Sequence, residues 1–177
     1  MKQFIVTIFL VFLTMPVFPE KGESYFHNYR NNRPPLIEKP YVELPIGCIK
    51  PMGWLNEQLE RMCTGMTGKL DSIYPQVMGP RNGWLGGDGD VWERGPYWID
   101  GLLPLAYIMD NKKLIDKVQP WIEWTLASQK SNGYFGPDTD RDYEEGLQRN
   151  NSQDWWPRMV MLKVMQQYYS ATGDERV

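Results

Sequence analysis

The chain has 177 residues, and its 22 acidic side chains against 19 Lys and Arg give a formal net charge of −3. It contains no basic run or stripe, which argues against a nucleic acid as its partner. Two cysteines, Cys48 and Cys63, are too few for a disulfide framework, although they could form one bridge. The sequence has a single histidine and no pattern of spaced histidines and cysteines, so it indicates no zinc site.

Residues 1–24 have the pattern of a secretory signal peptide. A basic start precedes residues 4–18, which carry no charge. This run is shorter than the ~20 apolar residues that span a bilayer, so an uncleaved membrane anchor is the less favoured alternative. Gly22 and Ser24 form a small-x-small pair. We therefore predict cleavage after Ser24, a periplasmic or extracellular location, and no stable membrane anchor after processing.

Residues 25–50 carry four prolines and are predicted to form an extended strap, because proline fixes φ and removes a hydrogen-bond donor. A helix is predicted to begin near Pro51 and to end at Gly65 or Gly68, since Pro51 suits a first turn and apolar residues follow at helical spacing. Those residues are Trp54, Leu55, Leu59 and Met62. Residues 71–90 have no stable period and are predicted to form one long loop, a kind of segment that is often functional.

Three further helices are predicted, over residues 92–110, 112–130 and 154–173. The first of them has an apolar stripe that should face the core. The stripe consists of Tyr97, Leu102, Leu105, Ala106 and Met109. Asp110 or Asn111 should cap the next helix.

The links between these helices alternate between short and long. Asn132-Gly133 predicts a turn with positive φ, and a polar loop follows it. Gly173 should end the last helix, and residues 174–177 have the pattern of the start of another. No segment of useful length has the period of a strand, so the predicted class is all-α.

One all-α architecture alternates its links in this way: the (α/α)6 toroid, a ring of six helical hairpins whose long loops gather on one face. Twelve helices of about 11–12 residues with links of about 4–6 residues need roughly 190–215 residues. Residues 51–177 number 127, enough for four helices and a first turn. We therefore predict an incomplete toroid, with residues 51–177 as the N-terminal portion of a larger domain.

Two stretches, residues 92–137 and 154–177, resemble the β-L-arabinofuranosidase-like glycoside hydrolase family 127. An aromatic helix opening is followed by a Gln-x-x-Asn-Gly-Tyr turn and by an aromatic, proline-bearing helix that ends in Ala-Thr-Gly-Asp. The similarity covers residues 44–177. It implies an (α/α)6 catalytic domain that removes terminal sugars from plant-type glycans, and the signal peptide agrees with such a substrate.

The chain departs from this family at the positions that carry chemistry. Family members use a glutamate acid/base and a cysteine nucleophile beside a zinc ion, all in later parts of the toroid, and Cys48 and Cys63 do not match that cluster. We therefore expect no cofactor or metal in this part of the chain, with zinc possible in the complete family domain, and assign no catalytic residue. A family histidine is replaced by Asp154, Trp155 and Trp156. The specificity for arabinose therefore stays open, with another sugar as the alternative.

Two loops supply the candidate sugar-binding residues, "GGDGDVWE" and "NSQDWWPR". Carboxylates can accept hydrogen bonds from hydroxyls, an arginine can donate them, indole rings can stack on a sugar, and glycine lets the backbone approach a ligand. The candidates are Asp88, Asp90, Trp92, Glu93, Asp154, Trp155, Trp156 and Arg158. Structural roles are the alternatives: Asp154 as an N-cap, Glu93 and Arg158 in surface ion pairs.

The sequence therefore predicts an N-terminal fragment of an exported glycoside hydrolase, inactive alone, whose partner is an oligo- or polysaccharide. Its oligomeric state is left open. Alternatives are a non-catalytic glycan-binding module and another toroid enzyme, such as a polysaccharide lyase or a sugar epimerase. The acidic run at Asp138, Asp140 and Asp142 fails as a calcium-binding EF-hand, since Tyr143 and Arg149 occupy the positions that require Gly and Glu.

Overall fold

The computed structural model describes residues 31–137 and 155–177, and this part of the chain is all-α without a β-strand. The elements are α1 (Gly53–Thr64), α2 (Met66–Ile73), α3 (Pro75–Met78), the 3-10 helix η2 (Gly83–Leu85), α4 (Arg94–Ile108), α5 (Lys112–Ala127) and α6 (Trp156–Thr172). The predicted class is confirmed. The predicted signal peptide and the acidic loop lie outside the described residues.

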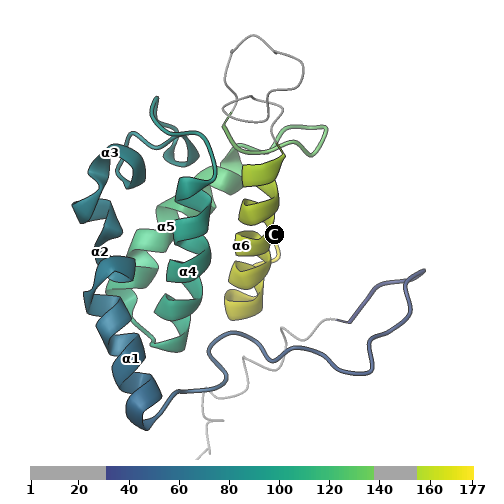
Figure 1. Ribbon diagram of the computed structural model, residues 1–177. Helices are drawn as coiled ribbons and strands as arrows, with labels where there is room; N and C mark the ends of the chain where they lie inside the picture. Colours follow the sequence, from purple (N-terminus) through teal and green to yellow (C-terminus); the bar gives the residue numbers. More distant parts are fainter. Residues whose placement is uncertain (1–30, 138–154) are drawn as a thin grey trace, which may run out of the picture.

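Helix α4 lies at the centre of the fold and packs against α5, α6 and the N-terminal helices. It is apolar on most sides, as expected of a helix surrounded by others. Ile99, Leu102, Leu103 and Ala106 are fully buried in it. Figure 1 shows α4 and α6 side by side and beginning at the same end, while α5 returns in the opposite direction. None of the described helices is long and apolar enough to span a bilayer.

A short turn joins α4 to α5. The Asn111 side chain accepts a hydrogen bond from the Leu114 N–H at 3.3 Å, so the predicted cap is confirmed at Asn111. Asp110 before it has a φ of 54°, which reverses the chain within a few residues. Leu114, Val118 and Ile122 of α5 then face the core.

A helix is found where the first one was predicted, and of its two predicted ends Gly65 is the observed one. Helix α1 ends at Gly65, where φ and ψ are −95° and −148°, and α2 begins at the next residue. The turn is tight: a Cβ on Gly68 would lie 1.8 Å from the Cys63 carbonyl oxygen. Glycines at both positions allow this close approach of the backbone at the break, and α2 continues beyond the end of α1 (Figure 1).

The predicted loop over residues 71–90 is wrong in part. It holds the end of α2, the single turn α3 and η2. Pro75 begins α3, where its missing N–H has no cost. The Asn82 side chain accepts from the Trp84 N–H at 2.8 Å and starts η2. These elements are too short to give a readable apolar period.

The described part of the strap, residues 31–50, has no regular secondary structure. It contacts the C-terminal ends of α4 and α6 (Figure 1). The Ile46 N–H donates to the Ser170 hydroxyl at 3.1 Å, and the Lys50 ammonium donates to the Ile108 carbonyl oxygen at 3.1 Å. Cys48 is exposed there, and neither Cys48 nor Cys63 is in a disulfide.

Arg176 stabilises the turn that follows α6. Gly173 ends α6 with a φ of 71°, as predicted. The Arg176 guanidinium then forms two bonds of 2.8 Å with the Glu123 carboxylate on α5 and also bonds Asp174. Hydrogen bonds from Arg176 are the main reason that the pKa values of Glu123 and Asp174 are lowered.

Because both carboxyl pKa values are lowered by folding, ionisation of these groups stabilises the protein above their unfolded pKa values of about 4. That contribution is lost as the pH falls through the folded values. We expect Arg176→Gln to reduce the loss of stability between pH 7 and about pH 3, with a small amplitude because Arg176 and Glu123 are exposed. Urea unfolding at both pH values measures this, with Arg61→Gln on α1 as the control. An unchanged acid dependence in Arg176→Gln would contradict the assignment.

Candidate functional site

The loop that precedes α4 and the loop that follows α5 meet at the end of the fold where α4 and α6 begin (Figure 1). We call this end, formed by residues 79–93, residues 128–137 and the first turns of α4 and α6, the loop end. Trp84 joins its parts. The Trp84 side chain is fully buried, and its indole N–H donates to the carbonyl oxygens of Val91 at 3.1 Å and Trp92 at 3.2 Å.

The Trp84 ring also fixes the turn after α5. It packs edge-on against Phe135 at a centroid distance of 6.3 Å and against Trp124 at 6.4 Å. A Cβ on Gly136 would lie 2.5 Å from the ring, so only glycine fits there. Sequence reasoning missed Trp84, because it lies among glycines in a segment without periodicity.

The glycine-rich run 86–89 has a structural explanation. It wraps around the backbone of Arg81: the Gly89 N–H donates to the Arg81 carbonyl oxygen at 2.6 Å, and a Cβ on Gly87 would lie 2.3 Å from the same group. The Arg81 guanidinium bonds the Asp88 carboxylate at 2.8 Å and 3.0 Å and lowers the pKa of Asp88. Both side chains are exposed. Asp88 therefore lies on the outer surface of the loop.

Asp90 occupies a different environment from Asp88. Its side chain is only 4% exposed, and its Oδ1 accepts from the Arg94 guanidinium at 2.5 Å and 3.2 Å. Its other oxygen, Oδ2, is buried without a hydrogen-bond partner. Hydrogen bonding to Asp90 is the main cause of the raised pKa of Arg94. Arg94 thus pairs with Asp90, and the neighbouring Trp92 and Glu93 are half-buried.

The start of α6 presents two exposed rings. Trp155 is 59% exposed and Trp156 is 48% exposed. Trp155 contacts Tyr134 edge-on at 5.6 Å, and Tyr134 belongs to the predicted Asn-Gly turn, where Gly133 has a φ of 84°. Indole rings at this exposure can stack on a flat apolar ligand. Asp154, the remaining candidate of this loop, lies outside the described residues.

Arg158 is buried and bonds the backbone. It is 3% exposed, its Nε donates to the Phe135 carbonyl oxygen at 2.8 Å, and its Nη2 donates to the Pro137 carbonyl oxygen at 2.7 Å. The guanidinium also lies 4.2 Å from the centroid of the Tyr134 ring. These contacts fix the turn after α5 in place.

The register of α4 against α6 is fixed by Asp100. It accepts hydrogen bonds from the Lys163 ammonium at 2.9 Å and from the Gln167 side-chain amide at 2.8 Å. Seven residues before this contact on each helix are Glu93 and Trp156. Figure 1 shows the two helices side by side and in the same direction, so helical periodicity predicts that both residues lie about two turns nearer the loop end, on the side of the seam.

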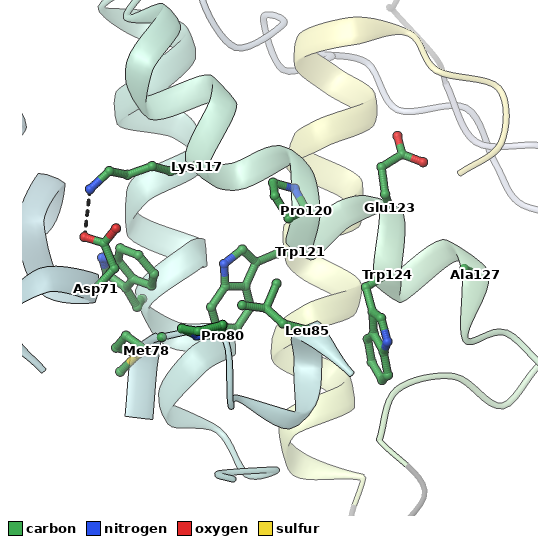
Figure 2. Close-up of a pocket in the computed structure, with 12 residues that line it drawn as sticks. Asp71, Met78, Pro80, Leu85, Lys117, Pro120, Trp121, Glu123, Trp124 and Ala127 are labelled. Carbon is green, nitrogen blue, oxygen red and sulfur yellow. Dashed lines mark hydrogen bonds and ion pairs between the residues drawn. The ribbon is translucent and has the colours of Figure 1, made fainter. Parts of the chain in front are cut away.

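A separate apolar groove of about 740 Å³ lies on the α5 side of the fold. Figure 2 shows Trp121 and Trp124 projecting into it from α5, opposite Leu85 and Pro80. An ion pair of 2.7 Å between Lys117 and Asp71 borders it. None of the candidate residues lines this groove. Its walls suit an apolar ligand. Its two carboxylates, Asp71 and Glu123, are paired with Lys117 and Arg176 and lie at opposite sides of the groove (Figure 2).

Within residues 31–137 and 155–177, no three His, Cys, Asp or Glu side chains are grouped closely enough to bind an ion. Cys48 in the strap and Cys63 on α1 do not fit the zinc–cysteine cluster implied by the family resemblance. No zinc-dependent chemistry is therefore assigned to these residues.

Comparisons with family models, with curated proteins and with solved structures found no match for this chain.

Proposed function

We propose that residues 51–177 are the N-terminal portion of an (α/α)6 glycoside hydrolase domain, in an exported protein that acts on plant-type glycans. The helix arrangement supports the architecture. Helices α4 and α6 run in the same direction as neighbours, and α5 returns between them in sequence. A toroid alternates inner and outer helices in this manner, so that loops of one kind collect at one end of the ring.

The observation that carries the functional proposal is the exposed ring of Trp156 at the loop end, near which the helical register predicts Glu93. A sugar ring has apolar faces and a rim of hydroxyl groups. Trp156 offers a half-exposed ring, and Glu93 offers carboxylate oxygens that can accept hydrogen bonds from hydroxyls. Trp155 adds a second exposed ring. The substrate class is therefore an oligo- or polysaccharide, with its ring against α6 and its hydroxyls toward α4.

We expect Trp156→Ala to weaken the interaction with oligosaccharides by on the order of 1–3 kcal/mol, by analogy with bases stacked on aromatic residues. This corresponds to about 5- to 150-fold in affinity or in kcat/KM. The protein to test is the full-length gene product, assayed on a panel of aryl glycosides and plant oligosaccharides. The melting temperature should change little, because the ring is half-exposed.

Trp54→Ala is the matched control. Trp54 also lies in the first turn of a helix and is 78% exposed, but α1 begins at the opposite end of the fold. If Trp156→Ala and Trp54→Ala behave alike, the loop end does not bind the sugar. If the full-length product binds glycans but hydrolyses none of them, the non-catalytic binding module replaces the hydrolase.

Residues 25–177 alone are expected to have no glycosidase activity. The described helices supply one wall of the proposed cleft, and no catalytic pair is assembled on it. The chain also exposes large apolar side chains on α6, including Met159 and Leu162, so the isolated fragment should self-associate. Hydrolysis assays and light scattering on this fragment check both statements. Activity that a point mutation in this fragment abolishes would contradict the first of them.

A further inference from the structure

The seam between α4 and α6 carries polar and aromatic groups that the candidate loops do not include. Tyr97 was expected in the buried stripe of α4, but it is 47% exposed. Asp100 follows it by three residues and Gly101 by four, so all three share one face of α4. A Cβ on Gly101 would find no atom within 4 Å. This face of α4 is therefore open beside Tyr97.

The opposite side of the seam supplies hydrogen-bonding groups. Asp100 is held by Lys163 and Gln167, one on each carboxylate oxygen. Its side chain is 18% exposed and that of Lys163 is 61% exposed. An ammonium has three donors and each carboxylate oxygen can accept more than one bond, so the pair retains both donating and accepting capacity. The Gln167 Oε1 is buried without a hydrogen-bond partner.

An exposed ion pair contributes little to stability, and the apolar contacts of α4 and α6 already hold the helices together. The side-by-side donors and acceptors match what adjacent hydroxyls of a sugar ring require, and Tyr97 offers a ring face one turn away. This cluster lies about two helical turns, roughly 10 Å, from Glu93 and Trp156 along the same seam. A ligand that occupies both places must have more than one ring.

We propose that Tyr97, Asp100 and Lys163 form a second sugar subsite, which binds the next residue of an oligosaccharide whose first ring stacks on Trp156. This inference rests on the function proposed above and adds to it a preference for chains over single sugars. Asp100 accepts hydrogen bonds from two adjacent hydroxyls, Lys163 donates to one of them, and Tyr97 packs against the ring. Gln167 positions the Asp100 carboxylate.

The test compares ligands of different length on the full-length gene product. Aryl monoglycosides and the matching di- and trisaccharides are assayed with Tyr97→Ala and Lys163→Met. Both variants should lose roughly tenfold in affinity or kcat/KM for the longer ligands and keep wild-type values for the monoglycoside. Lys112→Met is the control, because Lys112 also forms an exposed ion pair, with Asp116, but on α5.

The outcomes separate this inference from the function on which it rests. If Trp156→Ala weakens every ligand while Tyr97→Ala and Lys163→Met show no dependence on ligand length, the second subsite is wrong and the proposed function stands. If all three variants match the wild type on every ligand, both are wrong. Thermal melts of each variant ensure that a loss of binding is not a loss of fold.

Discussion

Trp84→Ala is expected to lower the free energy of unfolding by about 3–5 kcal/mol, the range found when a fully buried tryptophan is truncated. The ring has no exposed surface, and Gly136 and Phe135 pack directly against it. Its removal leaves a cavity and two carbonyl oxygens, of Val91 and Trp92, without their donor. Urea unfolding followed by circular dichroism measures the loss.

Trp84→Phe separates the effect of the cavity from the effect of the lost N–H donor. Phenylalanine keeps most of the packed volume but has no N–H donor, so this variant should lose about 1–3 kcal/mol, the cost of unpaired buried polar groups together with a smaller cavity. Trp54→Ala, at a mostly exposed position, serves as the control and should change stability little. If Trp84→Ala unfolds at the same urea concentration as Trp54→Ala, Trp84 does not hold the loop end together.

Arg158→Ala is expected to cost about 3 kcal/mol or more. The guanidinium is buried and bonds two carbonyl oxygens, and hydrogen bonds to charged groups contribute about 1.5–3 kcal/mol each. Arg158→Lys should recover little of this, because a lysine ammonium lacks the planar fork that reaches both oxygens from one position. Urea unfolding of the two variants gives the comparison.

Arg81→Ala is the matched control for the arginine. Arg81 also forms two hydrogen bonds, but with the exposed carboxylate of Asp88, so its loss should change stability little. Equal effects of Arg158→Ala and Arg81→Ala would contradict the structural role of Arg158. Full recovery in Arg158→Lys would show that only the charge matters at this position.

The central helices could be predicted from the sequence because their signals are local. The apolar pattern and the Asn111 cap placed α4 and α5 within about three residues of their observed ends, and Gly173 marked the end of α6. The same holds for α1, whose start near Pro51 and end at Gly65 are marked by local signals. The short elements between Gly65 and Trp84 could not be placed in this way, because they depend on which parts of the chain approach each other in the fold.

The candidate site could be predicted only in outline. The sequence identified the segments that meet at the loop end, since long loops of stacked hairpins collect there. It could not separate exposed Asp88 from buried Asp90, because both follow glycine. The bonds between Asp100, Lys163 and Gln167 depend on the register of two helices more than 60 residues apart in the chain, and no local pattern encodes that register.

The binding of a sugar at the loop end is the central claim, and fluorine NMR tests it most directly. The full-length gene product would be labelled with 5-fluorotryptophan, its resonances assigned by single Trp→Phe substitutions, and plant oligosaccharides added stepwise. We predict that the Trp156 resonance shifts saturably, while the resonances of Trp54 and buried Trp84 stay in place. Saturable shifts confined to Trp121 and Trp124 in the α5 groove, or no shift with any glycan, would contradict the account.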